Sequence, residues 1–165
     1  MKSSSTHAST GIRIRKAKPR EFLAIAVLDR VAWRQNRHGR FIPDGEHAWR
    51  VWCEQALTFV ACRDSQVIGA IMAFPCITGA YWLHKVMVAE RCRGLGIATR
   101  LMQALLQAVD RRGADISLTV DPANQPALRL YGKWGFTARK LVRGFYRGNE
   151  DRYVLTRQGR KDQNQ

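Results

Sequence analysis

Residues 88–99 read VAERCRGLGIAT and say more about the fold of this chain than any other segment. The run that leads into this segment, YWLHKVMVA at 81–89, has the pattern of a β-strand. The segment at 99–113 carries one apolar helical face and ends at Gly113. A strand therefore runs into a glycine-rich turn that opens a helix. Free backbone N–H groups and the positive end of the helix dipole meet at such a turn, where glycines let a pyrophosphate approach closely.

This turn differs from the two common nucleotide-binding loops. It lacks the Lys-Ser/Thr pair of a triphosphate loop, and it lacks the third glycine and the short βαβ unit of the dinucleotide fingerprint. Arg93 could add a charge-assisted hydrogen bond to bound phosphates. Because a lone pair of glycines is more often a structural turn than a phosphate site, a second motif is needed to decide.

Hydrophobic periodicity on both sides of the turn predicts one mixed α/β unit without internal repeats. Strands are expected at 11–17, 57–63, 66–75, 81–89 and 116–120, with two more around a turn at Gly148–Asn149. Helices are expected from Pro19 onward, at 46–55 and 99–113, and within 121–136, where the helix is entered at Asn124 and stopped by Gly135. The predicted order is β-α-α-β-β-β-α-β-α-β-β, and Asp64–Ser65 would close a hairpin without the usual Asn-Gly signature. Residues 1–10 and 157–165 are predicted to be disordered tails of a domain at 11–156.

Composition indicates a strongly basic protein. The chain has 165 residues, with 28 Lys and Arg against 13 Asp and Glu, which gives a net charge of +15. Such a field attracts polyanions, whether nucleic acid, an acidic protein or a phosphorylated cofactor. The sequence has neither a signal peptide nor an apolar run of membrane-spanning length, which predicts a cytoplasmic protein with no membrane partner. It gives no indication of oligomeric state.

The four cysteines show no zinc-ligand spacing. Their apolar surroundings predict core positions in a reducing compartment. Cys92 is the exception, because its charged neighbours favour an exposed position. It is not predicted to carry an acyl group, since nothing beside it forms a Cys–His pair.

A second motif follows the turn, with the pattern Asn124-x-x-Ala127-x-x-x-Tyr131-x-x-x-Gly135-Phe136. Together with the pattern Arg93-x-x-Gly96-x-Ala98, it resembles the paired motifs of the GNAT family of N-acetyltransferases. The predicted order of strands and helices is also that family's, so the resemblance covers residues 11–156. Within the family, the ending Phe145-Tyr146…Glu150-Asp151 is similar to the closing segment of bacterial ribosomal-protein alanine acetyltransferases.

The resemblance implies an α/β fold of the α+β kind, with a mostly antiparallel central sheet flanked by about four helices and split where acetyl-coenzyme A enters. It implies that backbone N–H groups of the strand before the turn hold the thioester, and that the turn wraps the pyrophosphate. Asn124 could also act only as a helix cap. No metal is implied. The implied cofactor-binding residues are Val86, Met87, Val88, Arg93, Gly94, Leu95, Gly96, Ile97, Ala98, Thr99, Asn124 and Tyr131.

Tyr131 is the predicted general acid. As an amine attacks the thioester directly in a ternary complex, coenzyme A leaves as a thiolate, which a nearby phenol can protonate. A tyrosine that only packs on the cofactor is the alternative interpretation.

The predicted general base is His84. The alanine acetyltransferases place a glutamate five residues before the motif asparagine, but here that position is Thr119, which cannot take a proton. A histidine at the matching strand position is a point of similarity with serotonin N-acetyltransferase. Strand alternation predicts that His84 shares a face with Val88, and a neutral imidazole suits the task. A packed histidine is the plainer interpretation, and Glu90, Glu54 or a water relay stay open as bases.

The resemblance places the acceptor amine between residues 34–52 and the closing hairpin near 145–152. Candidate lining residues are Arg37, Arg40, Trp49, Trp52, Tyr146 and Arg147, although helical spacing of the two tryptophans favours core packing. A protein N-terminus or lysine is the favoured acceptor. The alternatives are a small-molecule amine, or a nucleic-acid-associated role such as acetylation of aminoacyl-tRNA, to which the positive charge points.

Overall fold

The computed structural model describes residues 11–35 and 43–160. These residues form the predicted order of strands and helices. The helices are α1 (Phe22–Gln35), α2 (Glu46–Gln55), α3 (Ile97–Asp110) and α4 (Gln125–Lys133), with short 3-10 helices η1 (Pro19–Glu21) and η2 (Glu90–Cys92). The strands are β1 (Arg13–Lys16), β2 (Leu57–Arg63), β3 (Gln66–Pro75), β4 (Tyr81–Val88), β5 (Ile116–Val120), β6 (Ala138–Val142) and β7 (Arg152–Arg157).

The last strand reaches one residue into the segment predicted as a C-terminal tail. Arg157 lies in β7, and its guanidinium donates to both carboxylate oxygens of Asp110 at 2.7 and 2.8 Å. Hydrogen bonds from Arg157 hold the pKa of Asp110 below its usual range, despite partial burial. Residues 158–160 of that segment are also described, and the Gly159 N–H donates to Oδ1 of Asp115 at 2.9 Å. The other tail residues, 1–10 and 161–165, lie outside the described residues.

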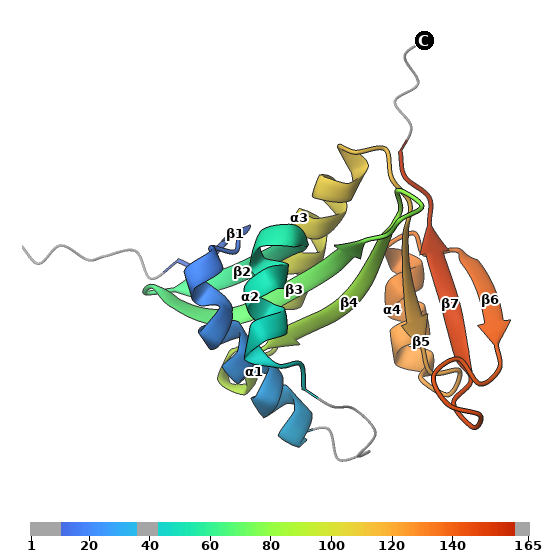
Figure 1. The fold of residues 1–165 in the computed structure, drawn as a ribbon, viewed down its shortest axis with the longest axis horizontal. Helices are drawn as coiled ribbons and strands as arrows, with labels where there is room; N and C mark the ends of the chain where they lie inside the picture. Colours follow the sequence, from blue (N-terminus) through green and yellow to red (C-terminus); the bar gives the residue numbers. More distant parts are fainter. Residues whose placement is uncertain (1–10, 36–42, 161–165) are drawn as a thin grey trace, which may run out of the picture.

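The described strands form one sheet in the order β1-β2-β3-β4-β5-β7-β6. Every neighbouring pair is antiparallel except β4 and β5, which are parallel and pair only through Tyr81–Ile116 and Trp82–Ser117. Beyond these residues the two strands diverge (Figure 1). The prediction of a mostly antiparallel sheet that is split in the middle is confirmed.

A β-bulge in β4 accompanies the divergence. Met72 of β3 lies opposite Lys85, whereas the next residue, Ala73, lies opposite Leu83, so His84 is the extra residue. A bulge bends its strand and increases the local twist. This bend turns β4 away from β5 just after their last shared pair.

Two apolar layers cover the two faces of the sheet. Helices α1 and α2 pack on one face around Ile25, Trp49 and Met72. On the other face α3 packs through Leu101 and Leu105. We refer to these as the α1–α2 face and the α3 face. Among the helices of the described residues, none has the length and apolar character needed to cross a membrane.

Two backbone features, at Gly69 and at the β2–β3 turn, account for the close packing of these elements. A Cβ at Gly69 would lie only 3.1 Å from the carbonyl oxygen of Met87 and 3.2 Å from Ile97, so glycine lets α3 approach β3. The β2–β3 hairpin turns at Asp64 and Ser65, whose φ values of 47° and 67° are both positive. Such values suit a tight hairpin turn, which explains the predicted hairpin without an Asn-Gly pair.

Candidate active site

The glycine-rich turn between β4 and α3 presents unpaired backbone donors. Gly94 and Gly96 have φ values of 77° and 69°, and a Cβ at either position would meet no heavy atom within 4 Å. Within the described part of the chain, the N–H groups from Gly94 to Thr99 donate no backbone hydrogen bond. Open space beside free N–H groups at the start of a helix is the geometry of an anion site.

Arg93 lies exposed at the mouth of this turn. Its guanidinium donates to the side-chain oxygen of Gln35 at 2.6 Å, and Gln35 in turn donates to Glu90 at 2.6 Å. These hydrogen bonds tie the end of α1 to the glycine-rich turn. Ile97, also predicted as a cofactor contact, buries its side chain in the core, so only its backbone can face a ligand.

The segment Val86–Val88 lines the gap between β4 and β5. Its residues pair with β3, and no described strand pairs with them on the other edge. Val86 and Val88 pack against the α3-face core, whereas Met87 is buried on the α1–α2 face. The side chains therefore serve the core while backbone groups are available to the gap.

Helix α4 carries the second predicted motif. Asn124 caps it, because Oδ1 accepts a hydrogen bond from the Ala127 N–H at 3.1 Å. Tyr131 packs against the α3-face core and meets Phe136 edge-on at 5.7 Å. Burial raises the pKa of Tyr131, so the phenol stays protonated at neutral pH. Among the described residues its hydroxyl has no hydrogen-bond partner, and it is not fully enclosed.

His84 belongs to a polar network between β4 and the segment that precedes α2. Its Nε2 lies 3.0 Å from Oδ2 of Asp44. Asp44 also pairs with Lys85, which donates to Asp29 Oδ1 at 2.7 Å. Asp29 is fully buried, and it accepts from the Trp49 indole N–H at 3.1 Å and the Asp44 backbone N–H at 2.7 Å.

The charge of Asp44 follows from this network. Burial by itself would raise the pKa of Asp44, but hydrogen bonds from His84 and Lys85 outweigh it and hold that pKa below its usual range. Asp44 is therefore ionised at neutral pH, and an ionised carboxylate can only accept hydrogen bonds.

The prediction that His84 shares a strand face with Val88 is wrong. The His84 ring lies 5.4 Å from Trp52 and 5.0 Å from Phe74, both on the α1–α2 face, whereas Val88 packs on the α3 face. The bulge is the physical reason, because one extra residue interrupts the period of two on which the prediction rested.

Aromatic side chains surround His84 on the α1–α2 face. Trp52 is half-buried and contacts the imidazole, whereas Trp49 is completely buried, as its helical spacing predicted. Two residues before His84 in β4, Trp82 stacks on Phe145 of the β6–β7 loop, with ring centroids 6.1 Å apart. The predicted lining residues Arg37 and Arg40 lie outside the described residues.

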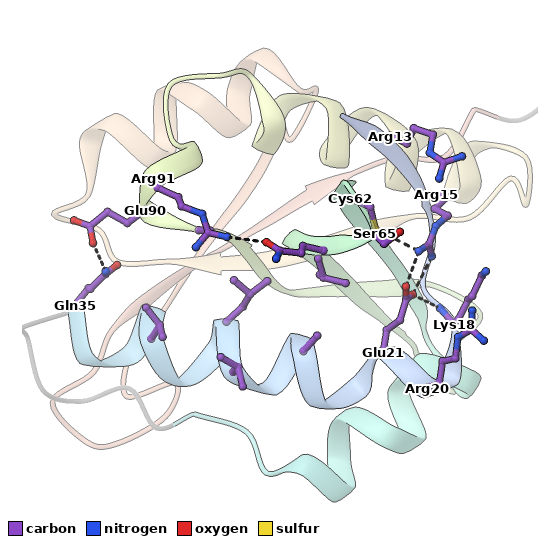
Figure 2. Close-up of a pocket in the computed structure, with 17 residues that line it drawn as sticks. Arg13, Arg15, Lys18, Arg20, Glu21, Gln35, Cys62, Ser65, Glu90 and Arg91 are labelled. Carbon is purple, nitrogen blue, oxygen red and sulfur yellow. Dashed lines mark hydrogen bonds and ion pairs between the residues drawn. The ribbon is translucent and has the colours of Figure 1, made fainter. Parts of the chain in front are cut away.

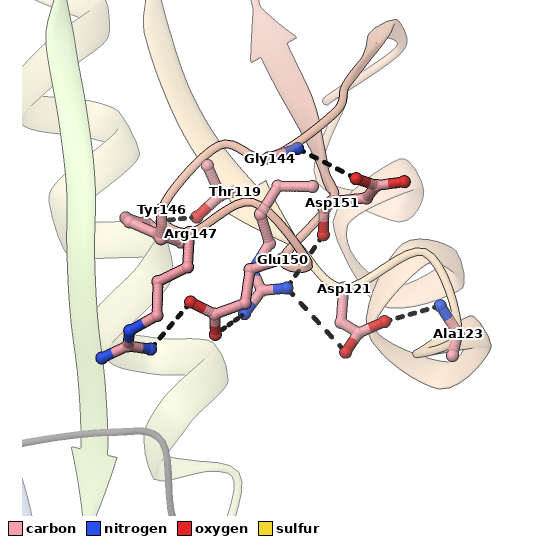
Figure 3. A network of polar contacts seen from close by, with 9 residues as sticks. Thr119, Asp121, Ala123, Gly144, Tyr146, Arg147, Glu150 and Asp151 are labelled. Atoms are coloured by element: carbon pink, nitrogen blue, oxygen red, sulfur yellow. Dashed lines mark hydrogen bonds and ion pairs between the residues drawn. The ribbon is translucent and has the colours of Figure 1, made fainter.

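The β6–β7 loop is held next to β5 by polar contacts (Figure 3). The Tyr146 hydroxyl lies 2.9 Å from Oγ1 of Thr119, the position at which the alanine acetyltransferases have glutamate. Glu150 is only 4% exposed and pairs with Arg147 at 2.8 Å and Arg152 at 3.4 Å. Tyr146 is itself 57% exposed, so it can offer its ring to a ligand.

Other candidates from the sequence are placed as follows. The expected exposure of Cys92 is wrong: the side chain is 1% exposed, because its polar neighbours sit on a 3-10 turn that directs it into the α3-face core. Glu54 pairs with Arg50 on the surface of α2, and Glu90 pairs with Gln35. Across residues 11–35 and 43–160, no three His, Cys, Asp or Glu side chains group closely enough to hold a metal ion.

Sequence reasoning missed Asp29, Asp44 and Lys85. A signal was available, because Asp29 interrupts the apolar run of the first helix and Lys85 interrupts that of a strand. Charged residues on apolar faces are rarely buried unless they are paired. The pairing itself was not predictable, since it joins segments far apart in the chain.

The comparisons with known proteins agree with this geometry. The model of the acetyltransferase (GNAT) family matches residues 25–136. An N-alpha-acetyltransferase of Sulfurisphaera tokodaii is 31% identical over 156 residues, which cover 87% of this chain and 90% of the relative. The ribosomal-protein-S18-alanine N-acetyltransferase of Escherichia coli superposes with a TM-score of 0.74 at 17% identity, covering 94% of this chain and 99% of that one. Naa50 of Arabidopsis thaliana, solved with the bisubstrate analogue CoA-Ac-MVNAL, has a TM-score of 0.66 at 19% identity, covering 88% of this chain and 97% of that one.

This chain belongs to the GNAT family of acetyltransferases, and it is an N-acetyltransferase that uses acetyl-coenzyme A. The residues present fit that group. The turn offers open space and free N–H donors for a pyrophosphate, and the gap beside β4 offers a backbone edge for the thioester arm.

Proposed function

We propose that this chain acetylates the α-amino group of protein N-termini, with Tyr131 as general acid and His84 as general base. The observation that carries the proposal is the placement of these two side chains on opposite faces of the sheet. Tyr131 belongs to the α3-face core, whereas His84 contacts aromatic rings of the α1–α2 face. With a base on one face of the sheet and an acid on the other, the amine could attack the thioester from one side while the thiolate leaves on the other.

Acetyl-coenzyme A supplies the activated acetyl thioester. Backbone groups of Val86, Met87 and Val88 would hold its thioester arm, and the N–H groups of Gly94–Thr99 with the Arg93 guanidinium would hold its pyrophosphate. Asn124 would contact the cofactor from the start of α4 while it caps that helix. The protonated Tyr131 hydroxyl would give its proton to the departing sulfur.

The proposed base depends on the hydrogen bond between His84 and Asp44. Because Asp44 is ionised, Nε2 of a neutral His84 carries the hydrogen and donates it, which leaves the lone pair on Nδ1. Asp44 is therefore a positioning residue that fixes the tautomer and the ring orientation. Lys85 and Asp29 in turn hold Asp44 against β4.

Three observations support an N-terminal amine as acceptor. The 31% identical relative of Sulfurisphaera tokodaii is an N-alpha-acetyltransferase. An α-amine, with a typical pKa near 8, needs a weaker base than a lysine amine near 10.4. The ring of Tyr146 is exposed and that of Phe145 is half-buried, and the two could flank a peptide whose N-terminus reaches the gap. A cytoplasmic location is part of this proposal, supported by the free thiols of the described cysteines.

The proposal is tested with matched peptides. One peptide has a free N-terminus and no lysine, and a second has a blocked N-terminus and one internal lysine. We expect acetyl transfer to the first only, read by mass spectrometry with acetyl-coenzyme A present. Transfer only to the lysine peptide, or only to small amines such as polyamines, would contradict it. Stabilisation of about 2.7 kcal/mol by acetyl-coenzyme A at 100 times its Kd verifies that the cofactor site is intact.

Gly96→Ala is expected to weaken binding of acetyl-coenzyme A. The φ value of 69° at Gly96 is strained for any residue with a Cβ, by about 1–2 kcal/mol, so the turn would shift its N–H groups away from the phosphates. Isothermal titration should show a Kd at least roughly tenfold higher. Gly148→Ala is the matched control, because Gly148 has open space and no positive φ. Equal affinities of the two variants would argue against phosphate binding at this turn.

Asp44→Asn is expected to lower kcat roughly tenfold with an unchanged Kd for acetyl-coenzyme A, because a neutral amide no longer fixes the His84 tautomer. His84→Gln should lower kcat by at least as much, and the double variant should be no worse than His84→Gln alone. Steady-state kinetics with the free N-terminus peptide give these values. Effects of the two single changes that simply multiply would show that Asp44 acts independently of His84.

A further inference from the structure

A groove of about 1070 Å³ lies away from the gap, between α1 and the strands β1 to β3 (Figure 2). The turn residues Gly94–Thr99 and the gap-lining residues Val86–Val88 do not line it. Gln35 and Glu90 close the end nearest the turn. The groove therefore shares no lining residue with the proposed cofactor site, and it adjoins that site through Gln35, which accepts a hydrogen bond from Arg93.

One wall of the groove is apolar and follows α1. Ala24, Val27, Leu28 and Val31 occur at helical spacing along this wall. Val27 is 49% exposed and Val31 is 40% exposed, so the stripe is not covered by the described residues. Val67 of β3 lies on the opposite wall.

The other end of the groove is basic. Arg13, Lys18 and Arg20 line it, and none of them forms an ion pair with any residue that the structure describes. The neighbouring Arg15 is neutralised by two hydrogen bonds to Glu21, at 2.9 and 2.5 Å. Figure 2 shows four cationic groups gathered at this end, those of Arg13, Arg15, Lys18 and Arg20. A fifth, that of Arg91, lies near Glu90 at the other end and donates to Gln66 at 3.3 Å.

These two features restrict the occupant. A second copy of this chain carries a charge of +15, and residues 1–10 contain no acidic side chain, so neither complements the basic end. A nucleic acid backbone would satisfy the cations but would leave the apolar wall without a partner. A segment with acidic residues at one end and aliphatic residues along its length satisfies both.

We propose that this groove binds an acidic–aliphatic peptide segment of a partner protein, with the acidic end at Arg13, Lys18 and Arg20 and the aliphatic residues along α1. From Ala24 to Gln35 the helix spans roughly 16 Å, the length of about five extended residues. The interaction is independent of the proposed acetyl transfer, since it uses none of the residues placed in that reaction.

The test uses a fluorescein-labelled peptide of three glutamates followed by five leucine, valine and alanine residues, with fluorescence anisotropy on the full chain. We expect binding that Lys18→Glu/Arg20→Glu weakens at least roughly tenfold, through loss of charge complementarity. Val27→Ser/Val31→Ser, which leaves the charge unchanged, should weaken it roughly fivefold. Lys133→Glu/Lys140→Glu changes the net charge equally at exposed sites outside the groove and should leave the Kd within about twofold.

Three results would overturn the proposal. Equal weakening by the control variant would mean that net charge alone binds the peptide. If Val27→Ser/Val31→Ser leaves the Kd of the peptide unchanged and RNA displaces the peptide, the basic end binds nucleic acid instead. A dimer in sedimentation that this valine variant abolishes would assign the apolar stripe to self-association. Circular dichroism melts verify that each variant is folded before its Kd is interpreted.

Discussion

Tyr131→Phe is expected to lower kcat by about 100-fold, the lower end of the usual contribution of a general acid. The raised pKa of Tyr131 keeps its hydroxyl protonated, so the hydroxyl can protonate the leaving thiolate. The variant keeps the ring that packs on Phe136. Because the hydroxyl has no hydrogen-bond partner among the described residues, its removal should leave thermal stability and the Kd of acetyl-coenzyme A unchanged.

The measurement combines steady-state kinetics with titration of the cofactor. Tyr146→Phe is the matched control, because it removes a hydroxyl that does have a partner, Thr119, at the acceptor side of the sheet. That control should change KM for the peptide more than kcat. If Tyr131→Phe keeps the kcat of the unmodified chain, Tyr131 only packs and the proton comes from another donor.

Lys85→Met is expected to destabilise the fold by about 3–5 kcal/mol, the usual cost of removing one partner of a buried ion pair. Lys85 is 6% exposed and Asp29 is completely buried, so the carboxylate left behind would be an uncompensated charge in the core. The indole N–H of Trp49 and the backbone N–H of Asp44 also donate to Asp29, but these two hydrogen bonds compensate its charge only in part. The free energy of unfolding in urea measures the effect.

A double variant isolates the physical cause. Lys85→Met/Asp29→Asn removes the charge but keeps an oxygen that can accept from the two N–H groups. We expect it to recover at least about half of the lost stability. A double variant as unstable as Lys85→Met would mean that packing of the lysine stem, and not the unpaired carboxylate, holds α1 to β4.

Local chemistry made the fold predictable. Glycines that adopt left-handed φ values at 94 and 96, an Asn124 that caps α4, and a stop at Gly135 are properties of short segments, and the structure has each of them. The hydrophobic periodicity of the strands and helices likewise gave their order. Errors at helix ends were small: the helix predicted to begin at Thr99 begins at Ile97, because the turn itself supplies the N-cap at Gly96.

The charge network required the tertiary structure. The sequence alone singled out His84, Tyr131 and the glycine-rich turn as candidates, since each lies within a single segment. Only the folded chain decided which face of the sheet His84 occupies, because one bulge residue reverses an alternation that sequence patterns assume. Only the fold brought Asp44 to His84 and Asp29 to Lys85, across separations of 40 and 56 residues. Pairing between distant segments depends on the packing of α1 against β4, which no local propensity encodes.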